Sequence, residues 1–220
     1  MWLEHPPKWF RALFPGAIFF LPAGREGAKR VFLTFDDGPI PEVTPWVLDI
    51  LDRYKVKATF FMVGQNAERY PHLLQEVIKR GHETANHSLH HVKGLGISTQ
   101  RYIHDVEEGS KATGSTLFRP PHGWLSPMQL SAVKKKKFTL VMYDIVTRDY
   151  SRRIDAERVV ENVKRYAKDG SIIVFHDSVK SWPRLQTALP ESIKWLKSRG
   201  YEFMTLSEAI ATRKSTKPIG

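Results

Sequence analysis

Short apolar runs, rich in β-branched and aromatic residues, alternate along this chain with longer amphipathic stretches. The runs have the composition of buried strands, and the stretches have the periodicity of helices. The expected strands are residues 31–36, 58–63, 83–86, 117–119, 138–143, 171–176 and 201–205. The expected helices are residues 42–54, 71–80, 98–113, 155–168 and 184–199, with one more beginning at Ser126-Pro127. Such alternation produces βαβ units, so we expect an α/β protein with a closed or nearly closed β/α barrel.

The polar residues of this chain fall repeatedly at the carboxyl ends of the expected strands, where β/α barrels carry their chemistry. Polar residues that only satisfy a core would have no reason to line up in this way. The aligned residues are Asp36 and Asp37 after the first strand, His87 and His91 after the third, Arg119 at the end of the fourth, Asp144 and Asp149 after the fifth, and His176 and Asp177 at the end of the sixth.

The adjacent carboxylates of Asp36 and Asp37 are the most unusual members of this set. Such a pair at a strand end most often forms a turn or a helix cap. Two ionised carboxylates side by side also repel each other unless a cation or a shared proton separates their roles. His87 and His91 are four residues apart, and one helical turn would place them on the same side. Two imidazoles and one carboxylate make a three-ligand site with open positions, as hydrolytic zinc sites require, and the second carboxylate can then accept a proton.

Two further residues suit catalysis. Arg119 precedes Pro120 and Pro121, which fix the direction of the chain, so its guanidinium could hold a carboxylate in place. His176 ends a strand apolar enough to be fully buried. It is therefore either a core histidine with satisfied hydrogen bonds or a general acid that protonates a leaving group.

The charge of the chain favours no partner by itself. The net charge is +11 and the isoelectric point about 9.8, but the one concentrated block is Lys134 to Lys137, which we interpret as a solvated helix C-terminus. No nucleic-acid motif with interleaved aromatic residues is present, so we expect no nucleic-acid partner. Weak contact with anionic surfaces remains an alternative. There is no cysteine, which excludes disulfides and thiolate chemistry.

The chain is long enough for one domain with a sizeable core, and we expect a monomer. Residues 1–28 are predicted to be an aromatic-rich arm packed on the domain, residues 29–212 the catalytic domain, and residues 213–220 a disordered tail. The apolar run at residues 17–21 is too short to span a membrane and lacks the basic region that precedes the core of a secretory signal. As written, the chain is therefore expected to have no transmembrane segment and to be cytoplasmic.

These motifs resemble those of the polysaccharide deacetylases, the NodB-homology domain of carbohydrate esterase family 4. The resemblance runs from about Val31 to Leu206. The Thr-Phe-Asp-Asp-Gly motif of the family is complete at residues 34–38, the His-Ser/Thr-x-x-His motif is present at residues 87–91, and the Arg-x-Pro turn at residues 119–121.

The resemblance implies a distorted (β/α)7 barrel, similar to a TIM barrel, and a metal-dependent active site. It implies that Asp37, His87 and His91 bind a divalent metal, with Zn²⁺ the first choice and Co²⁺, Ni²⁺ or Fe²⁺ as alternatives. The remaining implied roles are Asp36 as general base, Arg119 as the residue that orients Asp36, the backbone N–H of His122 as an oxyanion donor, His176 as general acid, and Asp149 as the residue that tunes His176.

The chain departs from the family pattern in the expected substrate pocket. His122 replaces the usual aromatic residue after the two prolines, and Asp149-Tyr150 takes the place of an Asp-Trp pair. Val146 stands where an Asp is frequent, and Val174 replaces a leucine in the wall that would contact the acetyl methyl group. We predict that His122, Tyr150, Val174 and Pro121 contact the substrate, so the departures affect which sugar fits rather than the chemistry.

The predicted activity is removal of the acetyl group from an N-acetylated oligo- or polysaccharide, of the peptidoglycan or chitooligosaccharide type, by attack of a metal-bound water. One alternative keeps the fold and changes the bond, as a formyl or cyclic-amide hydrolase. A second alternative, motivated by the net charge and the altered pocket, is a catalytically weak protein that binds a carbohydrate or a polyanion.

Overall fold

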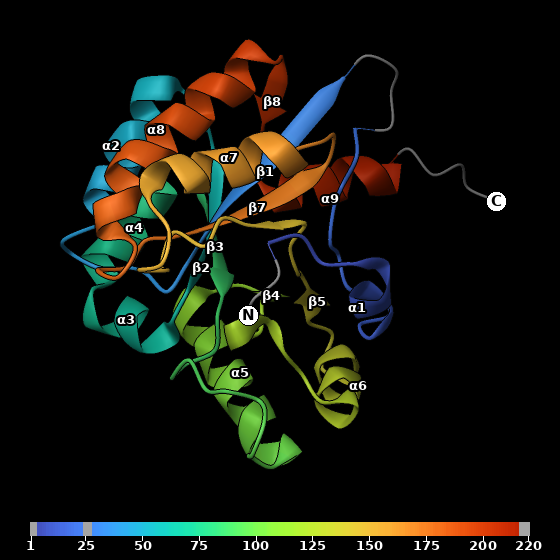
Figure 1. Ribbon diagram of the computed structural model, residues 1–220. Coiled ribbons are helices and arrows are strands. Elements are labelled where there is room, and N and C mark those ends of the chain that lie inside the picture. Colours follow the sequence, from blue (N-terminus) through green and yellow to red (C-terminus); the bar gives the residue numbers. More distant parts are fainter. Residues whose placement is uncertain (1–3, 24–27, 216–220) are drawn as a thin grey trace.

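Eight parallel strands form one curled sheet in the computed structural model, which describes residues 4–23 and 28–215 (Figure 1). Seven of them follow the order β5-β4-β3-β2-β1-β7-β6, and β8 pairs with the first residues of β1. The strands are β1 (Lys29–Asp36), β2 (Ala58–Met62), β3 (Glu83–Asn86), β4 (Leu117–Phe118), β5 (Thr139–Leu140), β6 (Ile145–Val146), β7 (Ser171–His176) and β8 (Tyr201–Phe203).

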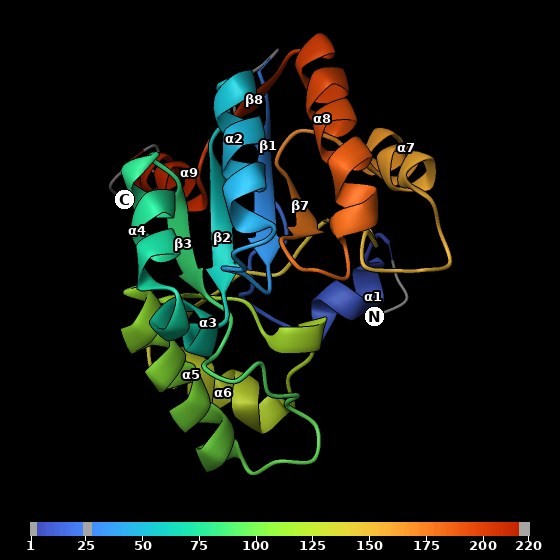
Figure 2. The ribbon, with the colours of Figure 1, turned by 90° about the vertical axis from the view of Figure 1, so that its left-hand side faces the viewer.

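The helices surround this sheet, so the predicted distorted (β/α)7 barrel is confirmed. In Figure 2, α4, α2 and α8 lie one beside the next over the outer face of the strands, and the apolar side chains between them form one core cluster. The helices are α1 (Lys8–Ala12), α2 (Thr44–Tyr54), α3 (Gly64–Arg69), α4 (Pro71–Lys79), α5 (Thr99–Thr113), α6 (Pro127–Lys135), α7 (Ala156–Tyr166), α8 (Trp182–Ser198) and α9 (Leu206–Ser215), with a 3-10 turn, η1 (Pro121–Gly123).

Strand β1 runs through the centre of the sheet, and its residues from Arg30 to Asp36 are all buried. A parallel strand covered on both faces needs apolar side chains in both directions, which explains the unbroken run Val31-Phe32-Leu33. The ring of Phe35 stacks on those of Phe60 in β2 and Phe175 in β7, at centroid distances of 4.9 and 6.1 Å. This packing fixes the carboxyl end of β1, where Asp36 stands.

One bent segment of the chain closes the barrel. Its first part, β5, pairs with β4, and its second part, β6, pairs with β7 on the other side. The strand predicted over residues 138–143 is confirmed at residues 139–140 and at the bridge of Val141, but the chain then bends, and β6, which was not predicted, begins at Ile145. Counted as one bent strand, β5 and β6 reduce the eight strands to seven.

The described part of the N-terminal arm, residues 4–23, packs against this bend. Ile18 bridges to Val141 between β5 and β6, and Phe20 bridges to Ser171 at the start of β7. Arg30 also holds the arm, because its guanidinium donates hydrogen bonds to the carbonyl oxygens of Leu21 and Pro22. The arm thus extends the sheet on both sides of the bend.

Asp144 belongs to the predicted alignment at the strand ends, but the structure places it elsewhere. Its fully buried carboxylate accepts hydrogen bonds from Arg11 at 2.6 Å and from the hydroxyl of Ser171 at 2.7 Å. Arg11 lies in α1, and Ser171 opens β7 at the end away from the cavity described below. Asp144 therefore fastens the arm to the barrel and takes no part in the active site.

Several helix ends follow from the sequence and others do not. Ser126 and Gln129 form a capping box at the start of α6, and Gly114 ends α5 in the left-handed region that suits glycine. The short helices α1 and α3 and the C-terminal α9 were not predicted. Because α9 extends to Ser215, residues 213–215 of the predicted tail are helical, and residues 216–220 lie outside the described part of the chain. Among the described residues, no helix is long and apolar enough to cross a membrane.

Candidate active site

A cavity of about 220 Å³ opens at the carboxyl ends of the strands. It is smaller than the roughly 300–1,000 Å³ typical of pockets for drug-sized ligands, so it suits one small group of a larger molecule that extends outside. Its lining consists of Asp36, Asp37, His87, His91, Arg119, Pro120, His122, Gly123, Tyr143, Val146, Tyr150, Val174, His176 and Lys180.

Asp37, His87 and His91 meet in this cavity. Oδ1 of Asp37 lies 3.2 Å from Nε2 of His91 and 3.8 Å from Nε2 of His87, and one donor atom from each of the three residues lies within 4.8 Å of the others. Burial acts to raise the pKa of Asp37, but its hydrogen bond with His91 and the charges of His176 and His87 outweigh burial and hold the pKa well below its usual value. A carboxylate that stays ionised beside two imidazoles is a suitable donor set for a divalent cation.

The two histidines lie on a loop and not on one helical turn, which corrects the sequence-based prediction. The backbone after β3 takes positive φ angles at Ser88 (63°) and His91 (55°), so it curls back without forming helical hydrogen bonds. His90 points away from the cavity, because its Nδ1 bonds to Asp105 in α5 at 2.6 Å. The same loop thus sends two imidazoles into the cavity and one outside it.

His87 is held with Nε2 toward Asp37 by a hydrogen bond on its other nitrogen. Its Nδ1 lies 2.8 Å from the backbone carbonyl oxygen of Arg119, and since a carbonyl only accepts, Nδ1 carries the proton. Burial is the main reason that the pKa of His87 falls from 6.5 to about 4. The neutral imidazole therefore presents an unshared electron pair at Nε2, as a metal ligand must.

Arg119 holds the carboxylate of Asp36 by a hydrogen bond. Its Nη1 donates to Oδ1 of Asp36 at 2.6 Å and to the hydroxyl of Thr34 at 2.8 Å, and its Nη2 donates to the carbonyl oxygen of Met142. The guanidinium also lies 3.9 Å from the ring centroid of Phe61, and the side chain is only 1% exposed. A buried cation with this many partners has one available position, so Arg119 fixes the orientation of Asp36.

His176 is held by Asp149 on the far side of β1. Nδ1 of His176 lies 2.8 Å from Oδ1 of Asp149, and the backbone N–H of His176 donates to the other oxygen of this carboxylate at 2.7 Å. Burial by itself would lower the pKa of His176, but the charge and the hydrogen bond of Asp149 outweigh burial and raise it to about 9. The imidazole is therefore protonated at neutral pH, with Nε2 free of this pairing.

Asp177 supports the turn that carries Asp37, a role that the sequence analysis did not identify. Its carboxylate accepts hydrogen bonds from the backbone N–H of Gly38 at 3.0 Å and from the hydroxyl of Thr44 at 2.6 Å. A Cβ atom at Gly38 would lie 2.0 Å from an oxygen of Asp177, so only glycine fits there. The strand-end position of Asp177 was a signal for this role, but its partners became visible only in the structure.

The walls of the cavity agree with the sequence analysis in part. His122, Tyr150 and Val174 line the cavity, as does Val146. Pro120 lines it where the sequence predicted Pro121, which is buried at the start of η1. The ring of His122 packs edge-on against His91 at 4.8 Å, and the ring of Tyr150 packs edge-on against His176 at the same distance.

Besides Pro120, three lining residues, Gly123, Tyr143 and Lys180, were missed by the sequence analysis. Tyr143 is 4% exposed, and burial raises the pKa of its hydroxyl group. Lys180 is exposed and follows β7 on the loop before α8. Neither a tyrosine next to a strand nor a lysine in a surface loop belongs to a sequence pattern that predicts a cavity wall.

Comparisons with known proteins agree on one family. A family model described as polysaccharide deacetylase matches residues 23–141. A peptidoglycan-N-acetylglucosamine deacetylase of Bacillus cereus is 35% identical over 189 residues, which are 83% of this chain and 88% of that protein. A solved peptidoglycan N-acetylglucosamine deacetylase is 28% identical, with a TM-score of 0.82 over 93% of this chain and 96% of the other. A family 4 acetyl xylan esterase from Clostridium thermocellum, solved with a cobalt ion, is 33% identical, with a TM-score of 0.76 over 84% and 92% of the two chains.

Proposed function

The chain belongs to the polysaccharide deacetylase family, and on this premise we propose which of its residues carry the reaction and which saccharide it acts on. It is a hydrolase of carbon–nitrogen bonds that deacetylates N-acetylated sugars, and metal dependence is a general property of the family. The observation that carries the proposed roles is the meeting of the Asp37, His87 and His91 donors with Asp36 and His176 in one cavity.

Asp37, His87 and His91 are proposed to hold the metal ion. When bound, a divalent cation lowers the pKa of a water molecule and polarises the amide carbonyl. Zn²⁺ is the proposed ion, because two imidazoles and one carboxylate with positions left open are a donor set of hydrolytic zinc sites. The cobalt ion in the acetyl xylan esterase makes Co²⁺ the first alternative to test.

Asp36 is proposed as the general base that takes a proton from the attacking water. Its carboxylate stands at the end of β1, beside Asp37, and Arg119 holds it by a 2.6 Å hydrogen bond to Oδ1. The buried guanidinium fixes the direction of the carboxylate, which is what proton transfer over a short distance requires. The repulsion between two adjacent carboxylates is then balanced by a cation on each, Arg119 for Asp36 and the metal for Asp37.

His176 is proposed as the general acid. Because Asp149 accepts from Nδ1 and keeps the imidazole charged, Nε2 can donate a proton to the nitrogen of the leaving amine. The backbone N–H of His122, on the loop that lines the cavity, is proposed to donate to the oxyanion of the tetrahedral intermediate.

The proposed substrate is an N-acetylglucosamine-containing glycan of the peptidoglycan type. The similarity to the deacetylase of Bacillus cereus supports this choice. The small cavity accommodates an acetylamino group, with Val174 and Tyr150 as proposed contacts of the acetyl methyl group and the sugar ring, and His122 and Pro120 as proposed contacts around them. The remaining sugars would lie outside on the surface.

Acetate release from N-acetylglucosamine oligomers and from peptidoglycan tests the proposal. We expect turnover that a chelator abolishes, that Zn²⁺ or Co²⁺ restores, and that Asp36→Asn lowers by roughly 10²–10⁴-fold, the usual contribution of a general base. His90→Gln is the matched control, since its imidazole lies in the same loop outside the cavity. Full activity in the presence of the chelator, or in Asp36→Asn, would contradict the mechanism. A panel with formylated and cyclic amides would detect the alternative hydrolase activity.

A further inference from the structure

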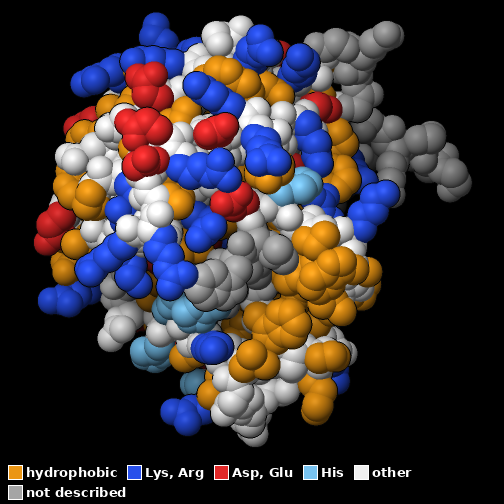
Figure 3. Space-filling model, in the orientation of Figure 1, with side chains coloured by type: hydrophobic (Ala, Val, Ile, Leu, Met, Phe, Trp, Pro, Cys, Tyr) orange, Lys and Arg blue, Asp and Glu red, His pale blue; other side chains and the backbone are white. Residues whose placement is uncertain are grey.

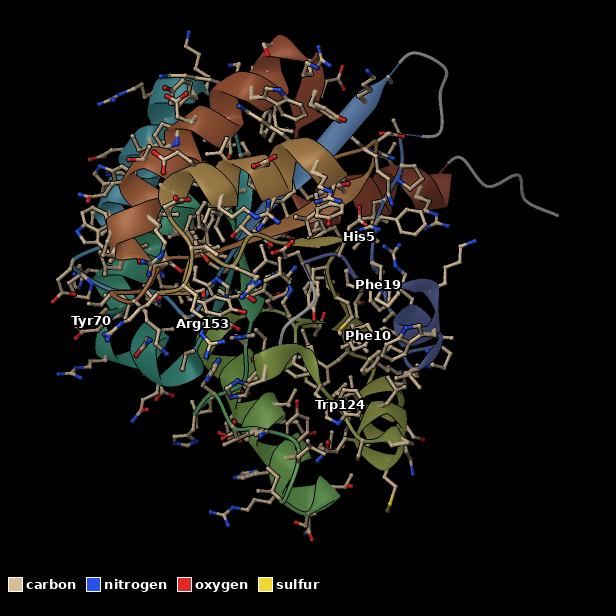
Figure 4. The ribbon with its side chains drawn as sticks, viewed as in Figure 1. His5, Phe10, Phe19, Tyr70, Trp124 and Arg153 are labelled. Atoms are coloured by element: carbon tan, nitrogen blue, oxygen red, sulfur yellow. The ribbon has the colours of Figure 1, made fainter. Side chains whose placement is uncertain are left out.

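The N-terminal arm presents large apolar side chains to solvent. Trp9 is 63% exposed, Leu13 48% and Phe20 42%, although each neighbours a buried aromatic residue. Trp9 and Leu13 are four residues apart at α1, so they share one face of it. Figure 3 shows hydrophobic side chains gathered over α1 and α6, where Figure 4 places Phe10, Phe19 and Trp124. We call Trp9, Leu13 and Phe20 the arm patch.

The arm patch is rigidly mounted. The rings of Phe10 and Phe14 beneath it are 3% and 2% exposed, and both contact the ring of Trp124, at centroid distances of 6.4 and 5.9 Å. A flexible terminus could fold its apolar side chains inward, but these backbone positions are fixed by the core below. The exposure of Trp9 and Leu13 is therefore a property of the fold. Large apolar side chains held exposed on one segment mark interaction sites.

The two sequence segments that form the arm patch and its neighbourhood are rich in basic residues. Residues 5–23 and residues 120–143 include no Asp or Glu, yet they carry Lys8, Arg11 and the block Lys134 to Lys137. The ammonium group of Lys134 lies 3.4 Å from where a Cβ atom of Gly16 would be, so α6 brings this block against the arm. Arg11 and Lys168 lie over the ring of Phe20, at 5.6 and 5.9 Å.

Some of these cations are available to a partner and others are paired. Lys8, Lys134 and Lys135 are exposed and form no ion pair with any described residue. Arg11 and Lys168 pair with buried Asp144 at 2.6 and 3.4 Å, and Lys136 pairs with Glu107 at 2.6 Å. A basic block at the end of a helix is explained by the helix dipole alone. The dipole does not explain why the block stands against the arm, at Gly16.

We propose that the arm patch docks on the surface of an anionic lipid bilayer. Tryptophan and leucine enter the boundary between headgroups and acyl chains, and lysines beside them contact anionic headgroups. A soluble polyanion would be bound by the lysines alone and would leave the apolar side chains in water. A lipid surface accommodates both the exposed apolar side chains and the lysines.

Docking would place the catalytic cavity next to the bilayer. Trp124, which contacts the arm, directly follows His122 and Gly123, which line the cavity. The enzyme would then act on N-acetylated sugars presented at a membrane surface, a consequence that rests on the proposed function. The lipid binding itself does not rest on it, so the two can fail separately.

Sedimentation of the full-length protein with large unilamellar vesicles tests the docking. We expect at least tenfold stronger partitioning to vesicles containing phosphatidylglycerol than to pure phosphatidylcholine, with the difference lost in high salt. Trp9→Ser with Leu13→Ser should weaken partitioning by roughly tenfold or more, since large apolar contacts are lost. Lys134→Gln with Lys135→Gln should also weaken partitioning by roughly tenfold or more. Each lysine near an anionic surface contributes about 1 kcal/mol, which corresponds to about fivefold in partitioning.

Ile78→Ser with Lys79→Gln is the matched control, because it removes an exposed apolar residue and an exposed lysine from α4. It should leave partitioning unchanged. All variants should release acetate from soluble oligomers as the parent does, which shows that they are folded. Equal binding to both kinds of vesicle, no vesicle binding, or equal losses in the control and the arm variants would each overturn the proposal. Binding to a soluble polyanion without vesicle binding would replace the lipid surface by an anionic polymer.

Discussion

His87 and His176 line the same cavity from opposite sides of β1, with side chains only 3% and 13% exposed, yet the structure gives them opposite charge states. Burial lowers the pKa of His87 to about 4, and the hydrogen-bond partner of its Nδ1 is a neutral backbone carbonyl, which brings no negative charge to oppose burial. The pKa of His176 rises to about 9, because the corresponding partner is the carboxylate of Asp149. The acceptor at Nδ1 therefore decides whether Nε2 offers an electron pair or a proton.

This difference divides the cavity into two parts with separate tasks. The part near β3 presents the three donors proposed to bind a cation, and the part near β7 holds the charged imidazole proposed to protonate the leaving group. Neither task follows from the residue type, since histidine can do both. Each of the following changes tests one part while the other serves as its reference.

The largest effect is expected from His87→Gln. An amide in place of the imidazole removes a donor from the metal site, so we expect loss of bound metal and at least a ~10³-fold fall in kcat/KM. Metal content after dialysis, measured by mass spectrometry, and acetate release check this. The protein with His90→Gln should keep both, since His90 bonds to Asp105 outside the cavity. A full equivalent of metal in the His87→Gln protein would show that His87 is not a ligand.

A smaller effect is expected from Asp149→Asn. Without the carboxylate, burial dominates and the pKa of His176 falls, so the imidazole is neutral at neutral pH and cannot act as an acid. We expect kcat to fall by roughly 10²–10⁴-fold with metal content unchanged. Asp105→Asn is the control, because it removes the same kind of carboxylate from a histidine outside the cavity. Loss of metal together with activity would show that the two parts of the cavity are not independent.

The two histidines also make opposite contributions to stability in metal-free protein. The folded pKa of His176 lies above 6.5, so its stabilisation is complete below pH 6.5 and is lost as the pH rises to about 9. The folded pKa of His87 lies below 6.5, so its contribution is complete above pH 6.5 and is lost as the pH falls to about 4. Each shift corresponds to roughly 3 kcal/mol at most. With respect to these two groups, stability is greatest near pH 6.5.

Urea unfolding in the presence of a chelator, at pH 5, 6.5 and 9, measures these contributions. In the protein with Asp149→Asn we expect the loss between pH 6.5 and 9 to shrink and the loss between pH 6.5 and 5 to grow, because burial then lowers the pKa of His176 as it does that of His87. An unchanged alkaline loss would mean that other groups cause it.

The smallest effect is expected at the wall of the proton-donating part. Tyr150→Leu removes the edge contact with the ring of His176, and such a contact contributes about 0.5–1.5 kcal/mol, so kcat/KM should fall by roughly 2–10-fold. Tyr150→Phe keeps the ring and should reduce the effect to less than about threefold. Equal losses in the two variants would assign the effect to the hydroxyl group instead.

The functional residues at the strand ends could be predicted from the sequence, but the backbone conformation of the loops that follow the strands could not. Asp36 and His176 follow unbroken apolar runs, and the parallel sheet brings such ends to one edge whatever connects them. The spacing of His87 and His91 fits both a helical turn and a loop. The loop requires a positive φ angle at Ser88, and a serine, unlike a glycine, does not indicate such an angle in the sequence. The sequence thus indicated which side chains meet but not the backbone that brings them together.

The role of Asp144 was not predictable for a different reason. Its partner Arg11 is 133 positions away, and the bend that turns the Asp144 carboxylate from the cavity depends on pairing with two separate strands. Patterns over a few residues contain no information about such distant pairing. The same holds for Gly38 and Asp177, whose close approach joins β1 to the loop after β7.

The bridges between the arm and the bend have a consequence for the order in which the chain can fold. Ile18 pairs with Val141 and Phe20 with Ser171, so the first segment of the barrel completes its hydrogen bonds with segments more than 100 residues later. Contacts of such long sequence separation form late, because the chain must first close the loop between them. Until then the outer edge of β5, which ends the sheet, is open to other strands. The arm is thus the first segment in the sequence and one of the last to find its place.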